Sequence, residues 1–198
     1  MYALHARYRG KAVRRAEAVR RAAAALATLP GVAPFQFVGV EDIRTTAHTP
    51  AAVVETVLAL LASGEWAVGI GIVSEPEAPE PSPAMVDRAV STATAALGST
   101  HRAGTLKVKV VPRKQDSAEI AGDIVSAFLL ITAVVAKRSE EGRQATSLMR
   151  RGYTQNEAAA ELGISKQAMS QRLQAAGWQA EKHGIALATH LVQRAGRP

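Results

Sequence analysis

The sequence contains no cysteine and no long uninterrupted hydrophobic run. The absence of cysteine excludes disulfide bonds and metal sites built on thiolates, which suits the reducing cytoplasm. The longest apolar run, Ile124 to Ala136, is interrupted by Ser126 and Thr132 and is too short to span a bilayer. Residues 1–7 lack the apolar core of a signal peptide. We therefore expect a cytoplasmic protein with no membrane partner.

Local signatures of metal, phosphate and nucleophile sites are also lacking. Gly69 and Gly71 lie inside a predicted strand, whereas a phosphate-binding loop requires a turn from a strand into a helix. His183 and His190 are seven residues apart on a predicted helix, with no nearby residue to complete a metal site. No Ser/His/Asp set has a local signature. We therefore expect no metal and no cofactor.

The net charge of +7 is distributed unevenly along the chain. Residues 1–30 carry seven basic residues and one acid, and residues 137–198 carry ten basic residues and five acids. The middle, residues 31–136, carries seven basic residues and eleven acids. Basic ends attract phosphate backbones. For the N-terminal end, the solvated face of a helix is an equally good explanation.

The first part of the chain alternates between predicted strands and helices. Strands are expected at Tyr2–Tyr8, Phe35–Val38, Ile43–Ala47, Glu65–Val73 and Leu106–Val111, and helices at Lys11–Leu29, Ala51–Ala62 and Met85–Leu97. The first six elements follow the order of a ferredoxin-like plait, an antiparallel sheet with helices on one face, and a further helix and strand come after them.

From Ser117 onward only helices are expected, the first of them from Ser117 to Lys137. Its apolar surface is wider than one stripe, which predicts burial on more than one side. The fold class is therefore α+β. A ferredoxin-like domain at residues 1–113 is followed by an all-α helix-turn-helix domain at residues 114–198, with the boundary near Pro112 to Asp116.

The stretch from Arg151 to Leu173 carries the pattern of a helix-turn-helix. Thr154 and Glu157 form a capping box that starts one helix, and Gly163 ends that helix in a left-handed conformation. Ser165 caps the next helix. Apolar residues at Ala159, Leu162, Ile164, Met169 and Leu173 have the spacing that packs two short helices across a tight turn.

The second helix presents polar side chains of the kind that read base edges in the major groove. Arg150, Arg151 and Arg172 are candidates for phosphate contacts, and Gln155 and Asn156 lie at a helix N-terminus, which also favours phosphate. The alternative is a two-helix hairpin with no role in DNA binding. The predicted DNA-binding residues are Thr154, Gln155, Asn156, Ser165, Lys166, Gln167, Ser170, Gln171, Arg172 and Gln174.

This stretch resembles the helix-turn-helix of many bacterial regulators, including region 4 of sigma factors. The chain also resembles the SatD-type bacterial family, relatives of GGDEF and class III nucleotidyl cyclase domains followed by a helix-turn-helix. The resemblance rests on the strand Tyr2 to Tyr8, the hairpin around Val38 to Ile43, and Trp66 to Ile72. It implies two carboxylates, one ending the first strand and one in a turn, that hold Mg²⁺ against a triphosphate.

This chain departs from that family pattern. The first strand ends with Arg7 and Arg9 and has no acid, and the hairpin acids Glu41 and Asp42 have no partner carboxylate opposite them. We interpret the first domain as a noncatalytic scaffold for oligomerisation or ligand sensing, and the two acids as solvated turn residues. The expected function is a homodimeric, sequence-specific DNA-binding protein that regulates transcription and is not an enzyme. The alternatives are a cyclase-like nucleotide-handling enzyme with a DNA-binding tail and a nucleoid-associated protein that coats DNA.

Overall fold

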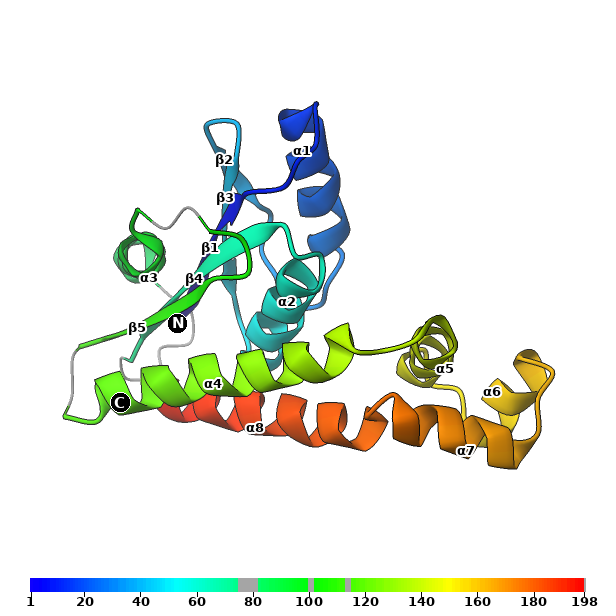
Figure 1. Ribbon diagram of the computed structural model, residues 1–198. Coiled ribbons are helices and arrows are strands. Elements are labelled where there is room, and N and C mark those ends of the chain that lie inside the picture. Colours follow the sequence, from blue (N-terminus) through cyan, green and yellow to red (C-terminus); the bar gives the residue numbers. More distant parts are fainter. Residues whose placement is uncertain (75–81, 100–101, 113–114, 198) are drawn as a thin grey trace. The chain divides into compact units, whose positions relative to one another are not determined.

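The computed structural model describes residues 1–74, 82–99, 102–112 and 115–197, and within them five strands and eight helices (Figure 1). The chain divides into two compact units. The first consists of Met1–Phe128 and Leu187–Pro198, and the second of Leu129–Ala186. The boundary passes through two helices, α4 (Ser117–Ala136) and α8 (Trp178–Gly196). A mixed sheet-and-helix region followed by a helical C-terminal region confirms the coarse expectation.

The first unit is built on one five-stranded sheet with the strand order β2-β3-β1-β4-β5. All neighbouring strands are antiparallel except β4 and β5, which are parallel because a helix connects them. The central strand β1 places Leu4 opposite Thr45 of β3 and Ile70 of β4. The strands are β1 (Tyr2–Tyr8), β2 (Gln36–Val38), β3 (Asp42–Ala47), β4 (Trp66–Val73) and β5 (Leu106–Val111).

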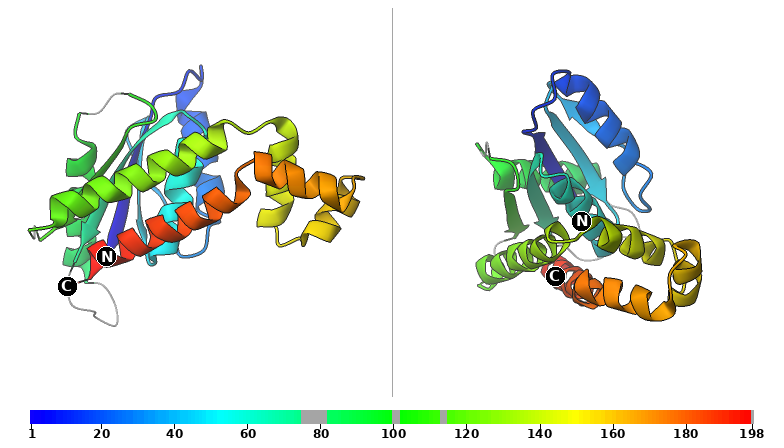
Figure 2. Two further views of the ribbon diagram at one scale, coloured as in Figure 1. Left: turned by 60° about the horizontal axis from the view of Figure 1, so that its bottom comes forward. Right: turned by 45° about the vertical axis from the view of Figure 1, so that its right-hand side comes forward.

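Helices cover both faces of this sheet. Helices α1 (Arg15–Leu26) and α2 (Pro50–Ala62) lie on one face and α3 (Pro83–Leu97) on the other (Figures 1 and 2). The two helices of the first six elements thus share one face, as the plait pattern predicts, and the further helix α3 covers the opposite face.

Two glycines of β4 explain why α3 packs on the second face. A Cβ atom on Gly71 would lie 2.4 Å from the backbone nitrogen of Ala93, and one on Gly69 would lie 2.5 Å from the Ala93 carbonyl oxygen. Gly69 and Gly71 therefore let the backbone of α3 approach that of β4 more closely than any side chain allows.

Helix α4 buries one stripe rather than two sides. Its buried residues are Ser117, Ile120, Ile124, Ala127, Phe128 and Ile131. Leu129 and Leu130 are 48% and 68% exposed, so the prediction of burial on more than one side is wrong. By length and composition, this 20-residue helix also qualifies as a membrane span, a test that core helices of soluble proteins pass as well.

The second unit contains three short helices, α5 (Glu140–Arg150), α6 (Gln155–Glu161) and α7 (Lys166–Ala175), together with parts of α4 and α8. Helix α5 is not among the helices that the sequence pattern predicts. Its start is stabilised by Ser139, whose hydroxyl accepts a hydrogen bond from the amide of Gly142 at 3.2 Å. The buried residues that join the three helices are Ala145, Leu148, Ala158, Ala159, Met169 and Leu173.

Candidate nucleic-acid interface

The connection between α6 and α7 has the local structure that its sequence predicts. The capping box at Thr154 is confirmed: the amide of Glu157 donates to the Thr154 hydroxyl at 3.3 Å, and the Glu157 carboxylate accepts from the Thr154 amide at 2.7 Å. Hydrogen bonds from the Thr154 backbone and hydroxyl lower the pKa of the Glu157 carboxyl. This network fixes where α6 begins.

Gly163 ends α6 and turns the chain toward α7. Its φ of +64° lies in the left-handed region, which costs glycine little. The amide of Ile164 returns to the Ala159 carbonyl at 3.0 Å, satisfying an acceptor at the end of α6. Ser165 then begins α7 by accepting a hydrogen bond from the Ala168 amide at 3.1 Å. Four residues, 162–165, therefore separate two well-capped helices.

Burial on the inner side of α7 holds that helix against its neighbours. Met169 and Leu173 are 0% and 4% exposed, and they pack with Ala158 and Ala159 of α6 and with Leu148 of α5. Because Ala158 and Ala159 have small side chains, α7 can pack close to α6. Burying a side chain the size of Met or Leu contributes about 1.5–3 kcal/mol, so these contacts fix which side of α7 faces outward.

The outer side of α7 carries an uninterrupted polar surface. Within the described residues, none of its exposed side chains makes a hydrogen bond or ion pair with another part of the protein. These side chains are therefore free to bond a ligand. They are Lys166, Gln167, Ser170, Gln171 and Gln174, all of them predicted DNA-contact residues.

The other predicted contact residues differ in exposure. Thr154, Asn156 and Ser165 are exposed, although the side chains of Thr154 and Ser165 also serve as helix caps. Gln155 and Arg172 are half-buried. The structure therefore brings most of the predicted set to the surface at the start of α6 and along α7.

The arginines near these helices have partners within the second unit. The Arg150 guanidinium, a candidate for a phosphate contact, donates to the Glu181 carboxylate. Arg151 lies over the ring of Tyr153, 5.2 Å from its centroid. Arg172 lies near Glu141: hydrogen bonds from the Glu141 backbone and from Ser139 lower the pKa of that carboxyl, and the charge of Arg172 lowers it further.

A buried ion pair in the same unit joins two residues that lie far apart in the sequence. Arg138 and Glu181 are 43 residues apart in the chain, and their side chains meet at 2.7 Å. No local pattern signals such a pairing. The second unit carries eight basic residues and five acids, a net charge of +3 that ion pairing within the unit leaves unchanged.

In the first unit, Glu41 and Asp42 are engaged by arginines. The Asp42 carboxylate accepts from Arg7 Nη2 at 2.8 Å and from His5 Nε2 at 2.9 Å, and Glu41 accepts from Arg9 Nη1 at 2.6 Å and also from Arg15. The prediction that these acids are solvated turn residues is wrong, because β1 runs beside β3 and brings its basic side chains against them.

The electrostatics of the two acids follow from these contacts. Burial raises the pKa of Asp42, but hydrogen bonds from Arg7 and His5 outweigh it, so that the pKa lies below its usual value. Hydrogen bonding from Arg15, aided by the charge of Arg9, likewise lowers the pKa of Glu41. Both carboxylates are ionised and already neutralised by protein cations. Among the described residues, no group of three or more His, Asp or Glu side chains is placed to hold a metal.

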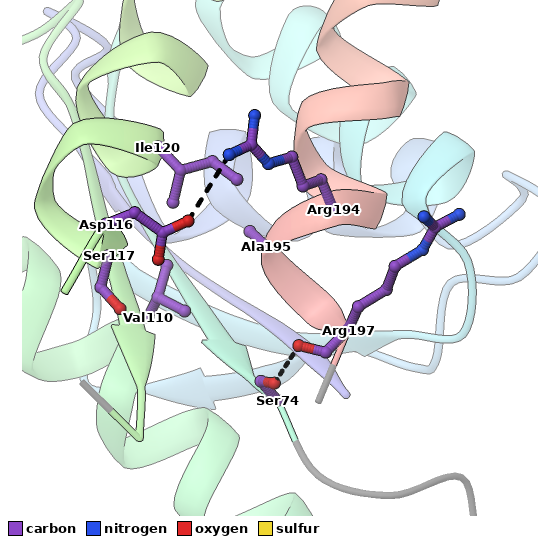
Figure 3. Close-up of a pocket in the computed structure, with 8 residues that line it drawn as sticks. All are labelled: Ser74, Val110, Asp116, Ser117, Ile120, Arg194, Ala195 and Arg197. Carbon is purple, nitrogen blue, oxygen red and sulfur yellow. Dashed lines mark hydrogen bonds and ion pairs between the residues drawn. The ribbon is translucent and has the colours of Figure 1, made fainter. Parts of the chain in front are cut away.

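A small cavity of about 200 Å³ lies in the first unit, between the start of α4 and the end of α8 (Figure 3). Arg194 points across it to Asp116 at 3.5 Å, and the Ser74 hydroxyl donates to the Arg197 carbonyl oxygen. These contacts join the last helix to the end of β4. The side chains of Arg194 and Asp116 thus pair with each other across the cavity, and the Ser74 hydroxyl is bonded to the backbone of Arg197.

In comparisons with known proteins, no family model, no curated protein and no solved structure matches the chain.

Proposed function

We propose that this chain is a sequence-specific, double-stranded DNA-binding protein that regulates transcription. In this proposal α6, the turn at residues 162–165 and α7 act as a helix-turn-helix, and α7 enters the major groove. The first unit, with strands β2-β3-β1-β4 in the order of a ferredoxin-like plait, serves as a noncatalytic scaffold. In this proposal the protein works in the cytoplasm. It acts as a homodimer, because dimers read two half-sites about one turn of DNA apart.

The observation that carries the proposal is the composition of the outer side of α7. Lys166, Gln167 and Gln171 are exposed and unbonded among the described residues, and no acid lies within the helix. Glutamine amides match the donor and acceptor pattern of adenine, and lysine matches the acceptors of guanine. A helix held on one side by a buried core and polar on the other can present these groups with little loss of conformational freedom.

Residues at the start of α6 contribute to positioning. Asn156 is exposed and Gln155 half-exposed next to the first free amides of that helix, where a DNA phosphate is favoured. Contacts of this kind set the register of the protein on the duplex, and the contacts from α7 then distinguish one sequence from another.

The arrangement of Glu41 and Asp42 disfavours the cyclase-like alternative. A Mg²⁺-triphosphate site needs carboxylate oxygens available to the metal. Here the two acids are bonded by Arg7, Arg9 and Arg15, which would repel the metal and compete for the same oxygens. The proposal therefore assigns no catalytic role to this part of the first unit.

The experiment that tests the proposal is selection of genomic DNA fragments bound by the full-length protein, followed by sequencing. We expect enrichment of a short, two-fold repeated motif, and loss of that enrichment in the Gln167→Ala/Gln171→Ala double variant. Fragments retained without any common motif would instead support a protein that coats DNA, and retention of none would contradict DNA binding altogether.

A further inference from the structure

The surface of α1 in the first unit is strongly basic. Lys11, just before the helix, Arg14 at its N-cap, and Arg20 and Arg21 within it are all exposed. The apolar residues of the helix face the sheet. They are Val19, Ala23 and Leu26, and all three are buried. We define the basic face of α1 as Lys11, Arg14, Arg20 and Arg21.

Few acidic side chains compensate this face. Within the described part of the chain, Lys11, Arg20 and Arg21 make no ion pair. Arg14 contacts Glu17 at 3.6 Å in a pair that is open to solvent on both sides. Exposed pairs of this kind contribute only about 0–1 kcal/mol, so the face retains its positive charge.

The placement of these cations is locally unfavourable for the helix. The positive end of a helix dipole disfavours basic residues, yet Arg14 occupies the N-cap without a capping hydrogen bond and Arg15 follows it. Every other helix with a described N-cap begins with a serine or threonine that accepts a backbone hydrogen bond. Departures from local preference of this kind tend to occur where function requires them.

The spacing of the arginines suits an extended polyanion. Arg14 and Arg21 are seven residues apart, which places them on the same side of the helix about 10.5 Å apart along its axis. Double-stranded DNA offers one negative charge per roughly 1.7 Å of its axis, so both guanidinium groups find phosphates along one face of a duplex.

A membrane surface fits the same helix less well. A helix that binds in the lipid interface buries a continuous apolar side among the headgroups. The apolar side of α1 is already buried within the first unit, and the fully exposed apolar residue nearby is the single Val13 before the helix starts.

We propose that the basic face of α1 is a second DNA-contact surface, which binds the phosphate backbone without reading sequence. This inference rests on the proposal that the chain binds double-stranded DNA, and it adds a contact made by the first unit. It gives the basic residues of the N-terminal segment a role in binding, whereas the alternative explanation is that they only form the solvated face of a helix.

The test compares two double variants of the full chain, Arg20→Ala/Arg21→Ala and Lys107→Ala/Lys109→Ala. Lys107 and Lys109 are exposed on β5, which is one edge strand of the sheet, whereas β2 is the other. Each of the two variants loses two positive charges. Alanine is the best helix former, so the α1 variant should fold, which circular dichroism checks. Binding to a labelled 30-base-pair duplex is measured by fluorescence anisotropy at salt concentrations between 50 and 200 mM, with selected and with random sequences.

We expect the slope of log K against log salt to become shallower by about 1.8 in the α1 variant, since each phosphate contact contributes about 0.9. At 0.1 M salt, affinity for both kinds of duplex should fall by roughly tenfold for each arginine. The β5 variant should keep the wild-type slope.

An unchanged slope in the α1 variant, or an equal loss in the β5 variant, would overturn the inference. So would a wild-type protein that binds vesicles containing anionic lipid but not DNA. Equal affinity for selected and random DNA would refute base reading by α7, yet the comparison of slopes would still decide the role of α1.

Discussion

Arg138 and Glu181 form an ion pair at 2.7 Å in which both side chains are almost completely buried, 1% and 3% exposed. Arg138 Nε also donates to the Ala176 carbonyl oxygen at 2.8 Å, and Arg150 donates to the other Glu181 oxygen. The pair therefore connects the segment before α5 with the end of α7 and the start of α8. The orientation of α7 depends on two charges that the protein has removed from water.

We expect Glu181→Gln to lower the free energy of unfolding by about 3–5 kcal/mol, because removing one partner leaves a buried charge without compensation. Unfolding in urea, followed by circular dichroism, measures the loss. Glu140→Gln is the matched control, since Glu140 pairs with Arg143 at 2.7 Å on the surface, where such pairs contribute about 0–1 kcal/mol. Equal stability of the two variants would show that the buried pair has no special role.

For α7, we expect Gln167→Ala and Gln171→Ala each to weaken binding to the selected DNA by about 1–3 kcal/mol and to affect random DNA much less. Each side chain is exposed and has no partner among the described residues, so the loss reflects contact with bases rather than unfolding. Gln179→Ala, at an exposed glutamine of α8 in the same unit, should bind like wild type. Wild-type affinity of both α7 variants for selected DNA would exclude this face as the reading surface.

We expect Gly71→Ala to destabilise the first unit by about 1–3 kcal/mol, the usual cost of overpacking a core. A Cβ atom there would lie 2.4 Å from the Ala93 nitrogen and 2.5 Å from the Ala89 carbonyl oxygen, both backbone atoms of α3. Gly122→Ala on α4 is the control: its Cβ meets nothing within 4 Å, so this change should stabilise by up to about 1 kcal/mol. Thermal unfolding of both variants distinguishes the two effects, and a Gly71 variant as stable as wild type would contradict the close packing of α3.

The pH dependence of stability should reveal the network around Asp42. The pKa of Asp42 is lower in the folded protein than in the unfolded chain, so its stabilising effect is complete above the unfolded value of about 3.9 and disappears as the pH falls through the lower folded value. Asp42→Asn should therefore lower stability at pH 7 and show a smaller decrease between pH 5 and pH 2. Urea unfolding over that range measures both, and parallel pH profiles for the two proteins would count against the ion pair with Arg7.

The dimer is tested by sedimentation of the full chain. At micromolar concentration we expect a species of twice the 20.8 kDa chain mass, because a single helix-turn-helix rarely binds tightly and dimers read paired half-sites. Exposed Leu129 and Leu130 on α4 are candidates for the contact between subunits. A 20.8 kDa species alone at that concentration would rule out the dimer.

Where local physics dominates, the sequence predicts the structure closely. Strands β1 and β5 have the expected bounds, and Ser165 caps α7 as expected, because alternation and capping depend on neighbouring residues. Helix α5 escaped prediction, although Ser139 followed by Glu140 and Glu141 is a start signal that could have found it.

Contacts between distant segments explain the remaining differences. The close packing of α3 on its side of the sheet depends on Gly69 and Gly71. Their lack of a side chain matters only because the backbone of α3 lies directly over them, and the sequence does not show that contact. The pairing of Asp42 with Arg7 requires β1 and β3 to lie side by side, and that of Arg138 with Glu181 spans 43 residues. No window along the chain contains both partners of either pair.

The chain leaves the first unit through α4 and returns to it through α8. Because Leu187–Pro198 belongs to the first unit, the second unit is an insertion, with one connection through α4 and another through α8. A fragment that stops after α4 would lack Ala188, Val192 and Ala195, which are buried in the intact chain. The second unit thus cannot be removed as a tail. A scaffold for separate study would have to be cut at both connections and rejoined by a short linker.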